Sequence, residues 1–255
     1  MISVITGASS GIGAAAATEL SRRGHHVVLV GRDRARLDAV AASLTGPEAD
    51  VLTCDFTSLD DVRRLGGELR ARYDDIDVLA NNAGVMSPAR RLTGDGHELM
   101  IQVNHLAPFL LTLELTGRVG RVVTTASMAG RSGRLDAADL NRERRRWNGW
   151  LQYGDTKQAN MLFTAALAER DVHATCFHPG VIRTGFAGGT LLMRACLAVP
   201  GLAKPPERGA AGLVELATTP GRPGGYYAGG RPTRGNADPE LAERLWEVSL
   251  RAVNG

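Results

Sequence analysis

The sequence predicts one α/β domain, residues 1–255, with a doubly wound parallel sheet of about seven strands and helices on both faces. Three observations predict this fold class. Short runs rich in β-branched residues alternate with segments of helical periodicity. The strands are almost continuously apolar, which is typical of strands buried on both faces. No repeat, low-complexity tract or Pro/Ser-rich linker divides the chain.

The predicted strands share a short apolar, often β-branched centre and end at polar or turn-forming residues. They cover Ile2–Thr6, Val27–Val30, Val51–Cys54, Val78–Ala80, Val122–Thr125, Ala174–Phe177 and, as a short last strand, Tyr226–Ala228. In such a sheet, ligands bind outside the carboxyl ends of the strands. The residues that follow each strand are therefore the ones to examine for chemistry.

The predicted helices lie between the strands and carry end signals. Gly24 stands in the position of a C-terminal cap, and Asp60 and Asp61 lie near the positive N-terminus of a later helix. Leu241 and Leu245 share one face of an amphipathic last helix. The helices cover Gly13–Arg23, Arg34–Leu44, Leu59–Tyr73, regions around Gly96–Leu115 and Tyr153–Glu169, and Pro239–Val253.

The composition excludes several classes of function. A net charge of +3 is too small to indicate nucleic-acid binding. The densest basic run, within residues 142–146, is interpreted as a solvated loop rather than a binding patch. The three cysteines show no zinc-ligand spacing, so we expect no metal. The apolar runs are too short for a signal peptide or a membrane span, so we expect a soluble cytoplasmic protein.

A glycine-rich segment, Thr6-Gly7-Ala8-Ser9-Ser10-Gly11-Ile12-Gly13, follows the first strand and opens the first helix. Gly7 permits a sharp turn, Gly11 lets the backbone approach a pyrophosphate, and Gly13 allows close packing of the helix on the strand. The N–H groups and dipole of a helix N-terminus attract phosphates. The segment therefore predicts a dinucleotide-binding loop.

This TGASSGIG segment resembles the signature of the short-chain dehydrogenase/reductase family, enzymes with an NAD(P)-binding Rossmann fold. Three further segments are similar to family motifs: Asp55 after the third strand, the NNAG of residues 81–84, and the PGxxxT of residues 179–184. The resemblance implies cofactor contacts from Gly7, Ser9, Ser10, Gly11, Ile12, Gly13, Asp55, Phe56, Asn81, Ala83, Gly84, Tyr153, Lys157, Pro179, Gly180, Ile182 and Thr184.

The end of the second strand predicts the cofactor. An acidic residue there binds the ribose 2′-OH of NAD, whereas a nearby arginine favours the 2′-phosphate of NADP. Here Gly31 stands in the acidic position and Arg32 follows it. We therefore expect NADP(H) rather than NAD(H). Asp33 leaves an alternative open, because it could pair with Arg32 or take the NAD role.

Four residues are similar to the family's catalytic set: Asn104, Ser127, Tyr153 and Lys157. Tyr153 and Lys157 are four apart and share a helix face. A neighbouring ammonium lowers the pKa of a phenol, which suits a general acid/base. Ser127 can stabilise charge on the substrate oxygen. The resemblance implies that Asn104 anchors a water molecule near Lys157. Together, the four residues predict an enzyme that interconverts a carbonyl and an alcohol.

The 26 positions from Ser127 to Tyr153 resemble the longer spacing of the retinol-dehydrogenase-like branch. The resemblance places a substrate lid at about residues 186–205, which are rich in apolar side chains. Trp147, Trp150 and Leu151 could form the opposite wall. An apolar pocket suggests a small, hydrophobic alcohol, aldehyde or ketone. The substrate itself, and the direction of the reaction, stay open.

Two other functions are compatible with this fold. One is a catalytically silent NADP(H)-sensing protein, against which the intact Ser127, Tyr153 and Lys157 argue. The other is an epimerase or dehydratase that recycles its cofactor, which the lack of a large C-terminal substrate region disfavours. The resemblance further implies homodimers or homotetramers, formed through the helices that carry Asn104 and Tyr153.

Overall fold

The computed structural model describes residues 1–182 and 203–255. Thr184 and almost all of the predicted lid lie outside the described residues. The eight described strands form one sheet in the order β3-β2-β1-β4-β5-β6-β7-β8, and every neighbouring pair is parallel except β7 with β8. The strand order reverses between β1 and β4, so these strands flank the switch point where such sheets bind ligands.

The strands lie close to their predicted positions. They are β1 (Ile2–Thr6), β2 (His26–Gly31), β3 (Asp50–Thr53), β4 (Ile76–Asn81), β5 (Val119–Thr125), β6 (Ala174–His178), β7 (Tyr226–Ala228) and β8 (Arg231–Thr233). The eighth strand was not predicted, because three residues that include Pro232 carry no strand signal. It forms an antiparallel edge, where proline is tolerated in a sheet.

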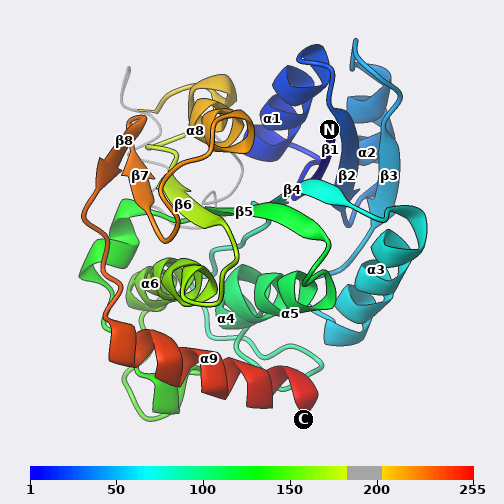
Figure 1. Cartoon of the computed structure of the whole chain (residues 1–255). Helices are drawn as coiled ribbons and strands as arrows, with labels where there is room; N and C mark the ends of the chain where they lie inside the picture. Colours follow the sequence, from blue (N-terminus) through cyan, green and yellow to red (C-terminus); the bar gives the residue numbers. More distant parts are fainter. Residues whose placement is uncertain (183–202) are drawn as a thin grey trace.

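Helices cover both faces of the sheet, and one further helix lies outside them (Figure 1). The first face carries α1 (Gly11–Arg22), α2 (Arg34–Ala42) and α8 (Pro206–Thr218). The second carries α3 (Leu59–Arg72), α4 (Leu99–Ile101), α5 (Ala107–Glu114) and α6 (Gly149–Ala168), and α9 (Pro239–Asn254) lies over it.

The alternation of side chains along the strands builds two cores. On β1, Val4 belongs to the core beneath α3, α5 and α6, while the next residue, Ile5, belongs to the core beneath α1 and α8. Val28 and Leu29 divide in the same way on β2. This explains the unbroken apolar strands, since both faces of a parallel sheet are buried.

Two helices depart from the predicted boundaries. The helix expected around Gly96–Leu115 is instead built of α4, a π-helical turn at Gln102–Leu106 and α5. The helix expected at Tyr153–Glu169 begins one turn earlier, where the Asn148 side chain accepts hydrogen bonds from the N–H groups of Trp150 and Leu151. Tyr153 therefore lies inside a capped helix rather than at its frayed end. Helix α8 was not predicted.

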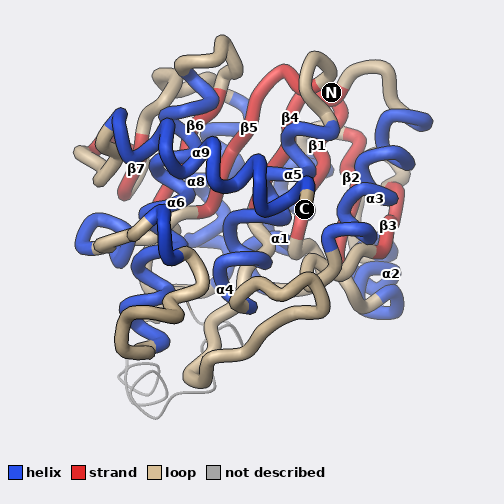
Figure 2. The backbone as a smooth tube through the Cα atoms, turned by 90° about the horizontal axis from the view of Figure 1, so that it is seen from below, coloured by secondary structure: helices blue, strands red, loops and turns tan. Residues whose placement is uncertain are grey.

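Helix α9 crosses the outer surface of α5 and α6, as the view from below shows (Figure 2). Its Trp246 ring lies 5.0 Å from the ring of Phe109 and 6.1 Å from that of Phe163, measured between centroids. The guanidinium of Arg170 on the end of α6 lies 4.0 Å from the Trp246 centroid. Helix α9 therefore packs on one side of the helices that carry Asn104 and Tyr153.

Among the described helices, none combines the length and apolar composition that crossing a bilayer requires. In the same residues, no group of three or more histidine, cysteine, aspartate or glutamate side chains could hold a metal ion.

His105 gives the fold a pH dependence. Its ring is 1% exposed, lies against Phe109 and Phe163, and hydrogen-bonds Ser249 of α9 through Nε2 at 2.8 Å. Burial lowers its pKa from 6.5 to about 3. The unfolded chain therefore binds a proton that the folded chain excludes, and the stability contributed by neutral His105 is lost as the pH falls from 6.5 towards 3.

We predict that the free energy of unfolding falls by up to about 1.4 kcal/mol per pH unit in this range because of His105 alone. His105→Gln can keep a hydrogen bond to Ser249 but does not titrate, so its stability should fall less steeply. Urea unfolding at several pH values between 4 and 7 measures both slopes. Equal slopes in the two proteins would contradict the assignment.

Candidate active site

The glycine loop after β1 is shaped by contacts that leave no room for side chains. Gly7 has a φ of +68°, and a Cβ there would lie 2.9 Å from Cα of Ala83 after β4. A Cβ on Gly13 would lie 2.3 Å from the carbonyl oxygen of Gly7. The loop therefore folds tightly against the end of β4 and delivers the N-terminus of α1 to the switch point. Ser10, the N-cap residue of α1, makes no side-chain capping bond.

A hydrogen-bond network joins the ends of β1, β4 and β5. The Thr6 hydroxyl donates to Ala80 O at 3.1 Å and accepts from the N–H groups of Asn82 and Ala83 at 2.9 and 3.0 Å. The Asn82 amide nitrogen donates to Thr6 O at 2.9 Å, and its oxygen accepts from the Thr125 hydroxyl at 3.2 Å. Asn82 thus bridges the glycine loop and the strand that precedes Ser127.

Ser127, Tyr153 and Lys157 meet beyond the end of β5. The Ser127 and Tyr153 side chains are hydrogen-bonded, and Lys157 Nζ lies 5.7 Å from the Tyr153 ring centroid. Lys157 Nζ donates to Thr125 O at 3.0 Å, as does Asn160 Nδ2 at 3.2 Å. Helix α6 is therefore tied directly to the strand that ends at Thr125.

The pKa values of this group are set mainly by burial. Burial raises the pKa of Tyr153 to about 12, and the hydrogen bond with Ser127 opposes the shift. Burial lowers the pKa of Lys157, which is 3% exposed, to about 8. The sequence led us to expect a phenol whose pKa is lowered by Lys157. In the protein alone, desolvation dominates, the opposing influence comes from Ser127 rather than Lys157, and the phenol stays protonated at neutral pH.

Asn104 lies within the π-helical turn, close to the catalytic helix. Its side chain accepts from Val85 N at 2.7 Å and donates to Val85 O at 3.0 Å and to the Thr156 hydroxyl at 3.1 Å. It therefore clamps the loop after β4 against the residue next to Lys157. The π-helical turn widens the helix at this point, and such turns often mark functional sites.

The segment after Ser127 packs directly on the backbone of α6. A Cβ on Gly130 would lie 2.6 Å from the carbonyl carbon of Lys157, so only glycine allows this approach. Ser127 caps the short 3₁₀ helix Met128–Ser132, and its Oγ accepts from Ala129 N at 3.3 Å. This packing brings the serine of one element to the tyrosine of another.

The long insertion before Tyr153 is anchored by buried charge. Asp155, 2% exposed, accepts from Arg142 Nη1 at 2.8 Å, Arg145 Nη1 at 3.0 Å and Arg134 N at 2.9 Å. Arg142 is 8% exposed. The interpretation of this basic run as a solvated loop is therefore wrong for Arg142 and Arg145. Local sequence could not reveal it, since the partner carboxylate lies on α6, between Tyr153 and Lys157.

The residues after β2 leave Arg32 available for a ligand. Asp33 caps α2 by accepting from Arg36 N at 3.1 Å, and it pairs with the Arg36 guanidinium at 3.2 Å. Arg32 is exposed, and none of the ion pairs of the described residues involves it. A Cβ on Gly31 would lie 3.7 Å from Cβ of Ser9, which places this strand end beside the glycine loop.

The other predicted cofactor residues differ in whether their side chains or only their backbone atoms can contact a ligand. The Asn81 side chain is 2% exposed and donates to the Thr112 hydroxyl of α5 at 3.1 Å. Phe56, 4% exposed, belongs to the core beneath α3 and α5. Both are left with backbone atoms for a ligand. The Asp55 carboxylate accepts from Thr57 N at 3.0 Å and is partly exposed.

Several predicted cofactor residues that follow β1 and β4 reach the surface. Ser10 is exposed, and the partly exposed ones are Ser9, Gly11, Ile12 and Gly84. At the same edge of the sheet, β6 is followed by Pro179, Gly180 and Ile182, and Gly180 has a φ of +90°. Sequence reasoning did not assign Asn82, Thr125 or Asn160. The second asparagine of NNAG and the position three after Lys157, on the same helix face, were the available signals.

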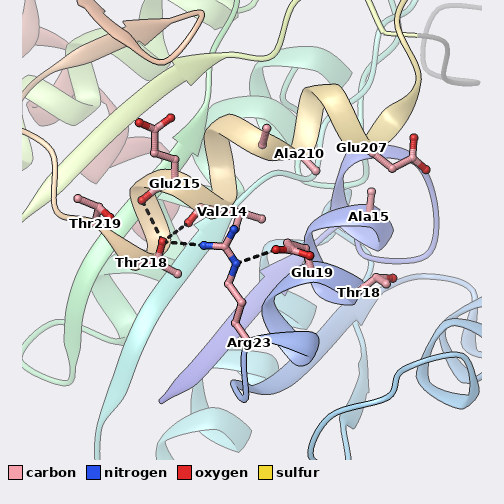
Figure 3. A pocket seen from close by; sticks show the side chains of 11 residues that line it. Ala15, Thr18, Glu19, Arg23, Glu207, Ala210, Val214, Glu215, Thr218 and Thr219 are labelled. Carbon is pink, nitrogen blue, oxygen red and sulfur yellow. Dashed lines mark hydrogen bonds and ion pairs between the residues drawn. The ribbon is translucent and has the colours of Figure 1, made fainter.

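A groove of about 490 Å³ lies elsewhere, between α1 and α8 (Figure 3). Arg23 crosses it, pairing with Glu19 at 2.7 Å and donating to the Thr218 hydroxyl at 3.4 Å. Its lining includes none of the candidate catalytic or cofactor residues. We therefore place the reaction at the carboxyl edge of the sheet, not in this groove.

Comparisons with known proteins identify the family. A family model described as short chain dehydrogenase matches residues 1–192. DnrU of Streptomyces sp. (strain C5), whose name assigns it provisionally as a daunorubicin C-13 ketoreductase, is 45% identical over 98% of this chain and 91% of its own. Human retinol dehydrogenase 13 is 33% identical over 98% of this chain and 83% of its own.

Among solved structures, a crystal structure of an uncharacterised protein from Mycobacterium paratuberculosis superposes with a TM-score of 0.82. It is 33% identical and covers 99% of this chain and 93% of its own. Fold and site together define an oxidoreductase of alcohols and carbonyls with a nicotinamide cofactor. The chain belongs to the short-chain dehydrogenase/reductase family, in the branch that includes the retinol dehydrogenases.

Proposed function

We propose that this protein is an NADP(H)-dependent oxidoreductase that interconverts a carbonyl and an alcohol on a hydrophobic substrate, with Tyr153 as the general acid/base. The observation that carries the proposal is the meeting of Ser127, Tyr153 and Lys157 beside the glycine loop. Gly7 and Gly13, where a Cβ would collide with backbone, form a loop that fits a dinucleotide pyrophosphate.

When bound, the nicotinamide supplies or accepts the hydride. In reduction, the Tyr153 hydroxyl donates its proton to the carbonyl oxygen of the substrate. The Ser127 oxygen accepts from Ala129 N, and its hydroxyl proton can turn from Tyr153 to that same substrate oxygen and stabilise the developing charge. The raised pKa of Tyr153 keeps the phenol protonated at neutral pH, which is the form that carbonyl reduction requires.

A turnover assay distinguishes the proposed enzyme from the alternative, a catalytically silent NADP(H)-sensing protein. NADPH oxidation is followed at neutral pH with a panel of aliphatic and aromatic aldehydes and ketones. We expect turnover with at least one hydrophobic carbonyl. Tight NADPH binding without turnover of any of them would favour the sensor.

Tyr153→Phe removes the proton donor and keeps the ring. We expect kcat to fall by at least about a hundredfold, the loss typical of a general acid. The dissociation constant for NADPH, measured by fluorescence, should change little, since the ring still fills its place. Turnover near that of the wild type would refute the role of Tyr153.

The exposed Arg32 supports NADP(H) as the cofactor, because its charge is free to bind a 2′-phosphate. Arg32→Ala should raise KM for NADPH about tenfold, the loss expected for one charge-assisted hydrogen bond, and leave KM for NADH unchanged. Arg34→Ala is the matched control, since Arg34 pairs with Asp38 at 2.8 Å on the same helix.

Gly31→Asp should move the preference towards NADH by supplying a carboxylate for the ribose hydroxyls. A Cβ at Gly31 meets its nearest neighbour, Leu37, at an ordinary 3.4 Å, so the fold should tolerate the change. Steady-state kinetics with both cofactors measure the preference. A wild-type protein that prefers NADH would contradict the proposal.

The substrate class follows from apolar side chains at the site. Trp150 and Tyr153 are three apart on α6 and share the face that carries Lys157. Trp150 is 37% exposed, and Met128, which directly follows Ser127, is 52% exposed. A ketone that carries a flat aromatic ring system fits such a wall, and the DnrU relative is named for the ketone at C-13 of daunorubicin. We therefore propose aromatic, polycyclic ketones as substrates.

Trp150→Ala should raise KM for a polycyclic aromatic ketone such as daunorubicin about tenfold, as the loss of one stacking contact predicts, and leave KM for a small aliphatic ketone unchanged. Leu151→Ala is the matched control: Leu151 is 55% exposed but lies off the Tyr153 face of the helix. Equal effects of the two substitutions would contradict the assignment of Trp150 to the substrate wall.

A further inference from the structure

His178 is the last residue of β6, at the same edge of the sheet as Ser127. Strands β5 and β6 run parallel with Thr125 opposite Phe177, and Ala126 N donates to Phe177 O at 2.8 Å. The next residues along the two strands are Ala126 and His178, and Ser127 directly follows Ala126. The sheet register therefore places the imidazole beside the start of the serine segment.

The His178 side chain accepts a hydrogen bond from this segment. Met128 N donates to His178 Nδ1 at 3.3 Å. An imidazole nitrogen that accepts carries no proton, so the ring is neutral with its proton on Nε2. Burial lowers the pKa of His178, which favours this neutral form. The proline that follows restricts the His178 backbone to extended conformations and so helps to fix the ring's position.

This bond completes the capping of the 3₁₀ helix that begins after Ser127. A helix start leaves its first N–H groups without intrahelical partners. Here Met128 N donates to His178 Nδ1, Ala129 N to Ser127 Oγ, and Gly130 N to Ser127 O at 3.0 Å. Without the imidazole, the Met128 N–H would lose its acceptor and would compete with the Ala129 N–H for Ser127 Oγ.

We propose that His178 is a positioning residue for the proposed reaction: by accepting the Met128 N–H, it keeps the Ser127 hydroxyl aimed at Tyr153 and the substrate oxygen. The inference rests on the proposed function but concerns a residue outside its catalytic set. It requires that His178 act through Ser127, and that cofactor binding not depend on it.

The test compares His178→Asn with His178→Leu. The Asn Oδ1 lies about where Nδ1 lies and can accept the same bond, whereas Leu cannot. We expect kcat for carbonyl reduction to fall about tenfold to a hundredfold in His178→Leu, and the NADPH dissociation constant to stay within about twofold. His178→Asn should recover kcat to within about threefold of the wild type.

A double-mutant cycle tests the route through Ser127. In the Ser127→Ala protein, His178→Leu should lower kcat by no more than about twofold further, because no hydroxyl remains to be aimed. The proposal would be overturned if the two substitutions lowered kcat independently, so that their effects multiplied. It would also be overturned if His178→Leu kept the wild-type kcat, or if the Leu and Asn variants lost kcat equally.

Amide hydrogen exchange at Met128 separates this inference from the reaction itself. The exchange should be slow in the wild type and in His178→Asn, and about tenfold or more faster in His178→Leu. This readout needs no turnover. If the wild type reduces no carbonyl but shows this pattern, the proposed function fails and the contact stands. Unchanged exchange in His178→Leu overturns the role of His178 in either case.

Discussion

The Asn82 amide joins the two halves of the site. Its nitrogen donates to Thr6 O, at the entrance to the glycine loop, and its oxygen accepts from the Thr125 hydroxyl. The backbone carbonyl of Thr125 in turn accepts from Lys157 and Asn160. The strands concerned, β1, β4 and β5, are neighbours in the sheet. One side chain thus fixes the glycine loop relative to Tyr153 and Lys157, and the proposed hydride transfer depends on that distance.

Burial and packing then determine the chemistry. The segment after Ser127 can meet Tyr153 because Gly130 lies on the backbone of α6, and the insertion is held there by the charges on Asp155 and Arg142. Breaking a buried ion pair is costly, so the insertion has one stable position over the helix. The same burial raises the pKa of Tyr153 and lowers that of Lys157, so the phenol is protonated at neutral pH, as the proposed reduction requires.

Much of this could be predicted from the sequence where the information is local. The glycine loop and the Tyr153–Lys157 spacing depend on neighbours along the chain, and strand periodicity placed seven of the eight described strands. The rest depends on contacts distant in sequence. Arg142 finds Asp155 only after folding, Trp246 of α9 covers Phe109 and Phe163, and the pKa of Tyr153 follows from how many groups surround it. None of these features leaves a periodic pattern in the sequence from which it could be predicted.

The most direct test of the account replaces Asn82 with alanine and measures NADPH affinity and kcat in the same folded protein. If Asn82 joins the glycine loop to the proposed acid/base group, both quantities should fall together, each by about tenfold, the loss expected for two partly buried hydrogen bonds. A fall in NADPH affinity with unchanged kcat, or the reverse, would show that the two halves of the site are held in place independently. Either result would contradict the account.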